Sequence, residues 1–347
     1  MSDVHLVVMA GGSGTRFWPK STSKKPKQLL GFNSDRTLLQ QTLDRFEGWV
    51  PESAQWIVTT QSLQSAVAEG SPRVNVLAEP QGRNTAPCVY WAARAIAEKN
   101  PRAVMLVMPA DHYIPRVDHF IKTVKAAAQW AVEKGDLVTL GVKPTRPETG
   151  YGYLHLGEKR GGDCVQVQAF VEKPNAAKAE EFVSSGQYLW NGGMFVWRVD
   201  SILEAFDRFM PEMKQIWDQA GGQILTAYPK MTATSIDYGV MEKARNVVTF
   251  PLDCGWDDVG SWTSLETLAA VWGKMQAGSA VLSGELVPVE SSGLVVDVPK
   301  DRLVATLGVD DLIIVESGKT ILVAHKSRAQ DIRKVVDAVK ARRPELT

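Results

Sequence analysis

The first half of the chain alternates short apolar runs with amphipathic stretches. Uninterrupted apolar or β-branched runs predict buried strands at residues 4–9, 56–60, 74–77, 104–108 and 137–142. Apolar positions that repeat every three or four residues predict helices at 37–46, 85–99 and 117–134. Strands that alternate with helices of this length are typical of an α/β fold, in which helices cover both faces of a mostly parallel sheet.

The second half of the chain has a different pattern. Residues 148–195 form short segments separated by glycines, interrupted by one predicted helix at 176–183 with Asn175 as its N-cap. A single helical stretch is predicted from Asp200 to Ala220, and another helix at 264–272. Beyond it, short valine-, leucine- and isoleucine-rich runs predict small strands with tight turns, followed by a terminal helix. We therefore expect two domains, at 1–275 and 276–347.

Composition excludes several classes of protein. The 347 residues include 39 basic and 39 acidic side chains, so no overall charge favours binding to nucleic acid or to an anionic membrane. The three cysteines are far apart, which argues against a disulfide framework or a zinc ribbon. No apolar run approaches the roughly 20 residues that a membrane-spanning helix needs. These features predict a soluble, cytoplasmic protein.

The segment after the first strand has the composition of a phosphate-binding loop. Gly11, Gly12 and Gly14 allow the backbone to curl around a ligand with its N–H groups pointing inward, and a cluster of basic residues follows. The spacing matches neither the P-loop nor the dinucleotide fingerprint. A P-loop that began at Gly11 would need its second glycine at Arg16 and a Lys-Ser or Lys-Thr pair after it, and Phe17 stands where the third glycine of the fingerprint belongs. The loop is therefore a polyphosphate site of another type.

A second candidate lies at the end of a later strand. Asp111 follows the predicted strand at 104–108, as the glycine loop follows the strand at 4–9. The carboxyl ends of parallel strands meet at one edge of a sheet, where ligands of α/β proteins bind. The loop and Asp111 are therefore expected to face one site although they are far apart in the sequence.

Six motifs, in order along the chain, carry a resemblance to a known family. They are Gly11-Gly-Ser-Gly-Thr-Arg-Phe-Trp-Pro19 with Pro26-Lys-Gln28, Glu79-Pro-Gln-Gly-Arg-Asn-Thr-Ala-Pro87, Pro109-Ala-Asp-His112, Phe170-Val-Glu-Lys-Pro174, Trp190-Asn-Gly-Gly-Met-Phe195 and Gly255-Trp-Asp-Asp-Val-Gly-Ser-Trp262. Together they resemble the mannose-1-phosphate guanylyltransferase (GDP-mannose pyrophosphorylase) family of sugar nucleotidyltransferases. The resemblance implies a Rossmann-like nucleotidyltransferase domain followed by a small β domain like a short left-handed β-helix.

The resemblance also implies a reaction and its central residues. A sugar 1-phosphate oxygen attacks the α-phosphorus of GTP, and GDP-mannose and diphosphate are the products. Since charge builds on phosphate oxygens, catalysis depends mainly on positioning and on cations. By resemblance, Arg16 neutralises the diphosphate and Lys27 is the catalytic lysine, while Asp111 and Asp258 hold Mg²⁺, an ion that prefers oxygen ligands. Asp257 and Asp258 cannot both point at the metal from an extended segment, where adjacent side chains face opposite sides, and the family pattern favours Asp258.

The remaining family positions divide into a nucleotide set and a sugar set. The nucleotide set comprises Gly11, Gly12, Ser13, Gly14, Thr15, Glu79, Asn84 and Thr85. A carboxylate can accept both N1–H and N2–H of guanine, so Glu79 is a candidate base reader, and Asn84 is the alternative. The sugar set comprises Gly152, Glu172, Lys173 and Asn191, with Glu172 accepting from hydroxyls and Lys173 meeting the sugar phosphate.

Two other functions stay open. The chain could use another hexose 1-phosphate, such as glucose 1-phosphate, or another nucleotide, because mannose and glucose differ in the orientation of one hydroxyl. A non-catalytic sensor of nucleotide sugars is disfavoured, since such relatives lose lysine or metal positions that this chain keeps. The small β domain is expected to mediate a homodimer, because exposed strands tend to be covered by a partner.

Overall fold

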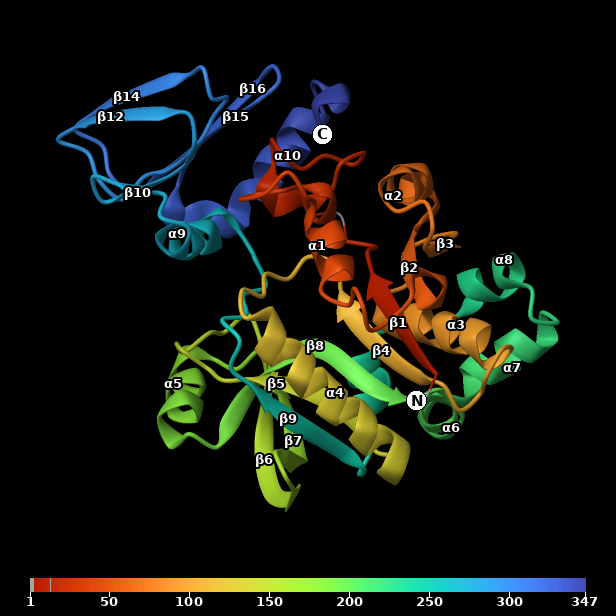
Figure 1. Ribbon diagram of the computed structural model, residues 1–347. Coiled ribbons are helices and arrows are strands. Elements are labelled where there is room, and N and C mark those ends of the chain that lie inside the picture. The colour runs from red at the N-terminus through yellow and green to blue at the C-terminus, as the bar shows by residue number, and fades with distance from the viewer. Residues whose placement is uncertain (1–2, 13) are drawn as a thin grey trace. The chain divides into compact units, whose positions relative to one another are not determined.

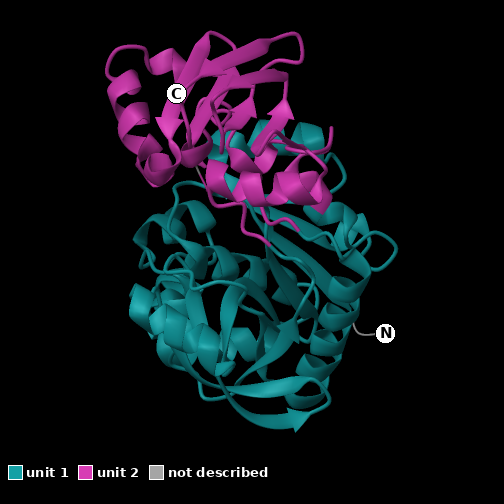
Figure 2. Ribbon diagram, turned by 90° about the vertical axis from the view of Figure 1, so that its left-hand side faces the viewer, with its two compact units in different colours: residues 1–11, 42–110, 114–256 teal, residues 12–41, 111–113, 257–347 magenta. Residues whose placement is uncertain are grey.

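The computed structural model describes residues 3–12 and 14–347, and they form two compact units (Figure 2). Unit 1 contains the residues up to Gly11, Thr42–Ala110 and Ile114–Trp256. Unit 2 contains Gly12–Gln41, Asp111–Tyr113 and Asp257–Thr347. Most of the glycine loop, together with Asp111, therefore belongs to the same unit as the C-terminal residues. No helix among the described residues is long and apolar enough to cross a membrane.

Unit 1 is built on a nine-stranded sheet whose strands follow the order β3-β2-β1-β4-β8-β5-β9-β7-β6. The strands are β1 (Val4–Met9), β2 (Gln55–Thr60), β3 (Asn75–Glu79), β4 (Val104–Pro109), β5 (Leu137–Val142), β6 (Gly152–Gly161), β7 (Cys164–Glu172), β8 (Tyr188–Arg198) and β9 (Val247–Leu252). The first four neighbours are parallel, and β8 runs antiparallel to both β4 and β5. The antiparallel part of the sheet is formed mainly by the glycine-punctuated segment, where the sequence pattern changes.

Helices accompany this sheet, as the periodicity predicts (Figure 1). They are α2 (Gln64–Gly70), α3 (Thr85–Ala97), α4 (Val117–Lys134), α5 (Ala176–Ser185), α6 (Val199–Phe209), α7 (Pro211–Gln219) and α8 (Ile224–Ala227), while α1 (Leu38–Asp44) is shared between the units. Asn175 caps α5 by accepting a hydrogen bond from the Lys178 N–H at 2.9 Å. The prediction of one helix from Asp200 to Ala220 is wrong, because Pro211 lacks an N–H and starts α7 after a break at Met210.

Unit 2 contains a β domain of coiled strands. Its strands are β10 (Met275–Gln276), β11 (Ser279–Ser283), β12 (Glu285–Val289), β13 (Val295–Asp297), β14 (Leu303–Leu307), β15 (Leu312–Ser317) and β16 (Thr320–His325). In one sheet β11, β13 and β15 are parallel neighbours, and β12 pairs with β14 in another. Successive strands thus alternate between two sheets, as in the turns of a β-helix. Two helices pack with it, α9 (Trp262–Val271) and α10 (Ile332–Lys340).

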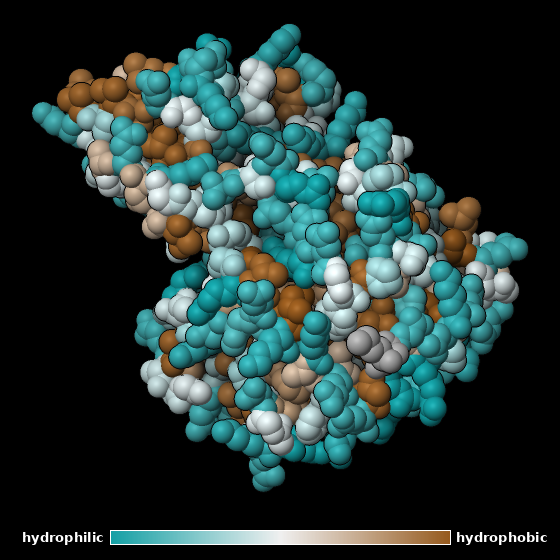
Figure 3. Space-filling view, viewed as in Figure 1, coloured by the Kyte–Doolittle hydropathy of each residue, from teal (hydrophilic) through white to brown (hydrophobic). Residues whose placement is uncertain are grey.

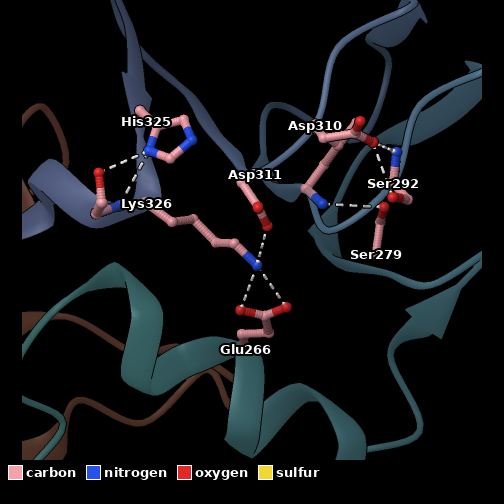
Figure 4. A network of polar contacts seen from close by, with 9 residues as sticks. Glu266, Ser279, Ser292, Asp310, Asp311, His325 and Lys326 are labelled. Atoms are coloured by element: carbon pink, nitrogen blue, oxygen red, sulfur yellow. Dashed lines mark hydrogen bonds and ion pairs between the residues drawn. The ribbon is translucent and has the colours of Figure 1, made fainter.

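An ionic network attaches α9 to this β domain (Figure 4). The Lys326 ammonium donates to both carboxylate oxygens of Glu266 at 2.9 Å and lies 3.0 Å from Asp311. Only 17% of the Lys326 side chain is exposed, so these interactions are partly shielded from solvent. Beside it, Asp310 accepts hydrogen bonds from the backbone N–H and hydroxyl of Ser292. The network fixes the helix against the ends of two β-helix turns.

Candidate functional site

The glycine loop of unit 2 is closely packed against Lys27. Gly14 adopts φ 58° and ψ 24° directly before the 3₁₀ turn Thr15–Phe17, a left-handed conformation that favours glycine. A Cβ at Gly14 would lie 2.5 Å from the Cβ and 2.6 Å from the backbone N of Lys27. The Gln28 amide donates to the Gly12 carbonyl at 3.0 Å. Gly14 is therefore required both by its conformation and by the space it leaves for Lys27.

The first and last residues of the predicted nucleotide loop differ in accessibility. Gly11 and Gly12 are exposed, and Thr15 begins a 3₁₀ turn and is half-buried. Ser13 lies outside the described residues. The Arg16 side chain is exposed, and its Nη1 donates to Gln330 Oε1 at 3.3 Å. Its guanidinium is thus accessible to an anionic ligand.

Lys27 brings together the predicted catalytic and metal residues of unit 2. It lies at the start of a 3₁₀ turn, Lys27–Leu29, with only 6% of the residue exposed. Its ammonium donates to Asp111 Oδ2 at 2.8 Å and to the Asp258 backbone carbonyl at 2.5 Å. A buried lysine needs such oxygen partners, because an isolated ammonium is costly to remove from water. Three segments that are distant in sequence therefore converge on one charged group.

The two candidate metal aspartates differ in their surroundings. Burial raises the pKa of the Asp111 carboxyl, but Lys27 and His112 lower it, and the resulting pKa lies below the ordinary value. The Asp111 side chain is 35% exposed, so its ionised carboxylate is accessible. Asp258 is half-buried, whereas Asp257 is buried and its Oδ1 accepts from the Val259 N–H at 2.7 Å. This difference favours Asp258 over its neighbour as a ligand.

These residues fit a Mg²⁺ ion only if substrate supplies further ligands. Among residues 3–12 and 14–347, no group of three or more His, Cys, Asp or Glu side chains is placed to hold a metal. Mg²⁺ is commonly bound by one or two carboxylates together with substrate phosphates and water. The Asp111 carboxylate contacts Lys27 directly, and Asp258 contacts it through its backbone carbonyl, so the residue types present agree with a site of one or two carboxylates.

In unit 1, Glu79 is a buried carboxylate at the end of β3. The Tyr228 hydroxyl donates a hydrogen bond to its Oε1, and a Cβ at Gly11 would lie 3.0 Å from its Oε2. Burial raises the pKa of the Glu79 carboxyl, and the Tyr228 bond opposes this increase. The Glu79 carboxylate therefore lies directly beside the first glycine of the loop.

Asn84 and Thr85 are involved in forming the start of α3. Asn84 has φ 64°, and its side chain accepts from the Thr85 N–H at 2.9 Å. The Thr85 hydroxyl accepts from the Ile236 N–H at 2.9 Å. These contacts give Asn84 and Thr85 a structural role at the start of α3, as the Tyr228 bond does for Glu79, so which of Glu79 and Asn84 reads the base stays a prediction. Arg83 has a similar structural role, since its guanidinium donates to the carbonyls of Pro229 and Met231.

The four predicted sugar residues lie together in unit 1, where β6, β7 and β8 adjoin. Gly152 pairs with Glu172 across β6 and β7, and a Cβ at Gly152 would lie 2.6 Å from Glu172 Oε2 and 3.5 Å from the Asn191 Cβ. Lys173 lies 2.6 Å from Glu172 and has φ 46°. The hydrogen bond to Glu172 raises the pKa of Lys173 above its usual value. Unusual backbone conformations of this kind are frequent at ligand sites.

Asp237 belongs to the same group but was missed by sequence reasoning. The Asn191 amide donates to Asp237 Oδ1 at 2.7 Å, and Asn191 Oδ1 accepts from the Gly193 N–H at 3.2 Å and the Thr139 hydroxyl at 3.3 Å. Asp237 begins a π-helical turn, Asp237–Met241, a rare element often found at functional sites. Burial raises its pKa, and the nearby Glu172 contributes. No periodic signal marks this residue in the sequence.

Comparison with known proteins identifies the family. The nucleotidyl transferase family matches residues 5–272, and the MannoseP isomerase/GMP-like beta-helix domain matches residues 284–339. A mannose-1-phosphate guanylyltransferase from Escherichia coli K12 is 37% identical over 98% of this chain and 74% of its own length. The chain belongs to the mannose-1-phosphate guanylyltransferase family.

Other members of this family support the assignment. Mannose-1-phosphate guanylyltransferase ManC of Salmonella typhimurium LT2 is 37% identical over 97% of this chain and 73% of its own length. A crystal structure described as mannose-1-phosphate geranyltransferase from Thermus thermophilus is 36% identical, with a TM-score of 0.89 over 97% of this chain and 99% of that one. The family assignment confirms the predicted α/β nucleotidyltransferase fold with its C-terminal β domain. The boundary at residue 275 stays a prediction.

Proposed function

We propose that this nucleotidyltransferase converts GTP and mannose 1-phosphate into GDP-mannose and diphosphate. The observation that carries the proposal is the buried Lys27 ammonium, which contacts both Asp111 and the Asp258 backbone. Transfer of a nucleotidyl group requires cations and their ligands to be fixed around the reacting phosphate. Relatives named mannose-1-phosphate guanylyltransferase support this substrate pair.

The role of the unit 2 residues follows from the charge that the reaction moves. An oxygen of the sugar phosphate attacks the α-phosphorus in line, the bond to the bridging oxygen breaks, and diphosphate leaves. The backbone N–H groups of the glycine loop cradle the phosphates, and the exposed Arg16 guanidinium neutralises the departing diphosphate. Lys27 is the group proposed to hold the reacting phosphates, since its ammonium carries the positive charge that they need. Among the described residues this ammonium donates to the Asp111 carboxylate and the Asp258 carbonyl.

A Mg²⁺ ion completes the proposed charge balance. Asp111 and Asp258 would hold it, since the Asp111 carboxylate is accessible beside Lys27 and Asp258 is only half-buried and contacts Lys27 through its backbone carbonyl. When bound, the ion supplies positive charge to the phosphate oxygens. The lowered pKa of Asp111 keeps its carboxylate ionised, which is the form that binds a cation.

Unit 1 provides the groups proposed to select the base and the sugar. Glu79, oriented by Tyr228, accepts from N1–H and N2–H of guanine. Glu172 accepts hydrogen bonds from sugar hydroxyls, and Lys173 binds the sugar phosphate. The preference for mannose over glucose is the most specific claim of this proposal, because the two sugars differ only in the orientation of one hydroxyl.

One experiment tests reaction class, base and sugar together. Purified protein is incubated with Mg²⁺ and a matrix of nucleoside triphosphates against hexose 1-phosphates, and diphosphate release is measured. We expect the highest kcat/KM for GTP with mannose 1-phosphate. A higher value for glucose 1-phosphate or another nucleotide would replace the substrate assignment. Binding of GDP-mannose without any turnover would instead favour a regulatory protein.

We also propose that the protein is a homodimer held by its β domain. Large apolar side chains are exposed on three strands of this domain: Val287, Val289, Leu303, Leu307, Ile321 and Val323. Figure 3 shows apolar residues gathered over the region where Figure 1 labels β12 and β14. Contiguous exposed apolar surface is typical of an interface. Light scattering should give twice the monomer mass, and the double variant Leu303→Lys/Leu307→Lys should reduce it; a monomeric wild-type protein would refute the dimer.

The proposed compartment is the cytoplasm. The cysteines Cys88, Cys164 and Cys254 are free and buried in the structure, as suits a reducing environment. Burial raises the pKa of Cys164 and of Cys254 to about 11, so both thiols are protonated and unreactive at neutral pH. Fractionation of cells that express the tagged protein would test this localisation.

A further inference from the structure

The segment that carries the phosphate loop is attached to the β domain by a partly buried ion pair, in which the Lys20 side chain is 31% exposed and that of Asp297 4% exposed. We call residues 14–27 the loop segment. Within it, the Lys20 ammonium lies 2.5 Å from Asp297 Oδ1, and Asp297 is on β13 with only 3% of the residue exposed. Lys20 reaches this strand from the stretch between the glycine turn and Lys27. The contact therefore joins the loop segment to the interior of the β-helix.

The other contacts of the loop segment lead to the same C-terminal elements. The Trp18 indole N–H donates to the Leu346 carbonyl at 2.9 Å, and the Trp262 indole N–H donates to the Trp18 carbonyl at 3.3 Å. The ring of Phe17 packs on that of Trp262, with centroids 5.3 Å apart. These residues share one apolar cluster with α9, α10 and the β-helix strands. The apolar side chains of the loop segment therefore pack in the same hydrophobic core as the β domain.

Arg16 connects this attachment to the proposed reaction, because the residue proposed to bind diphosphate also contacts a C-terminal element. Its guanidinium donates to Gln330, which lies in the 3₁₀ turn Lys326–Asp331 just before α10. A neutral acceptor at one nitrogen restricts the orientation of the guanidinium and does not neutralise its charge. Arg16 and Lys27 are therefore placed at either side of a segment whose middle is fixed by Lys20.

We infer that the β domain positions the loop segment for catalysis, and that Lys20, Asp297 and Gln330 are positioning residues for the phosphates of GTP. The inference rests on the proposed function, since it assigns these contacts to the GTP side of that reaction. A buried ion pair contributes little to net stability compared with apolar residues, but it fixes one relative arrangement of the groups it joins. Consistent with this, burial raises the pKa of Asp297, and Lys20 only partly offsets the increase.

The test compares two ion pairs of the same unit in steady-state kinetics. Asp297→Asn weakens the pair that holds the loop segment, and Arg302→Met removes the pair between Arg302 and Glu316, which joins two parts of the β domain and includes no residue of that segment. We expect Asp297→Asn to lower kcat/KM for GTP by at least about 10-fold, because a misplacement of 1 Å can cost about 100-fold. The KM for mannose 1-phosphate should stay within about twofold. Arg302→Met should leave kcat/KM for GTP unchanged.

A third variant keeps the inference testable if Asp297→Asn fails to fold. Gln330→Ala removes the neutral acceptor of Arg16 at an exposed contact, and it should lower kcat/KM for GTP, as should Gln330→Glu, whose carboxylate would neutralise the Arg16 guanidinium. Unchanged GTP kinetics in folded Asp297→Asn or in Gln330→Ala, or an equal kinetic loss in Arg302→Met, would overturn the inference. Absence of wild-type turnover would instead refute the proposed function. GTP binding by calorimetry, compared between wild type and Gln330→Ala, would then still decide whether the contact positions the loop.

Discussion

Replacing Gly14 with alanine should damage activity far more than stability. The residue has φ 58°, and a side chain in this left-handed conformation costs about 1–2 kcal/mol. The added Cβ would also lie 2.5 Å from the Lys27 Cβ, whereas ordinary van der Waals contact begins at 3.4 Å. Relief of this clash requires a movement of roughly 1 Å at the loop or at Lys27, and a shift of that size reduces kcat by about 100-fold.

The matched control is Gly48→Ala. Gly48 also has a left-handed conformation, with φ 74°, but a Cβ there would meet nothing within 4 Å. It should show the same conformational cost of about 1–2 kcal/mol in urea unfolding, with unchanged kcat. Steady-state assays and unfolding curves of both variants separate the two effects. A folded Gly14→Ala protein with kcat close to wild type would refute the close packing of the loop on Lys27 as a requirement for activity.

Four further predictions follow from the two groups of site residues. Lys27→Met should lower kcat by about 100-fold or more through loss of transition-state stabilisation, and a change confined to the KM for GTP would make it a binding residue only. Asp258→Asn should abolish the response of the rate to added Mg²⁺, whereas Asp257→Asn, which keeps an acceptor for the Val259 N–H, should retain it; the opposite result would exchange their roles. Asp237→Asn should raise the KM for mannose 1-phosphate without changing the KM for GTP, and equal effects on both substrates would contradict a sugar-side role. Burial raises the pKa of Glu79 above 4.5, so the folded protein loses stability relative to the unfolded chain as pH rises from about 4.5 through the folded-state pKa. Glu79→Gln has no such ionisation, so in urea unfolding its stability relative to wild type should increase over this pH range. A difference that does not change with pH would refute this.

The secondary structure of the first half was predictable because its apolar runs are long and uninterrupted. Val7 and Val8 of β1 are completely buried between parallel neighbours, which is why the strand has no polar alternation. Asp200 to Ala220 was predicted as one helix because apolar periodicity continues across Pro211, whereas the missing N–H of proline decides the break. The hydrophobic pattern of the sequence thus predicted strands well where every residue of the strand is buried.

The candidate site was predictable only in part. Lys27, Asp111 and Asp258 carry recognisable motifs, and the structure brings them together. Asp237 and Tyr228 could not be found in this way, because their importance comes from contacts with Asn191 and Glu79 that no local spacing encodes. Nor does the sequence show that Arg83, a charged residue within a family motif, is engaged by backbone carbonyls.

The attachment of the loop segment to the C-terminal elements also determines when the site can form during synthesis. The loop leaves the ribosome long before its partners do. Lys27 donates to the Asp258 carbonyl, Lys20 pairs with the Asp297 carboxylate, and Trp18 donates to the Leu346 carbonyl. With translation at about 5–20 residues per second, the glycine turn waits many seconds for these partners. A nascent chain therefore contains the whole glycine motif before the contacts that fix it exist, and the arrangement needed for catalysis can form only after Asp258, Asp297 and Leu346 have been synthesised.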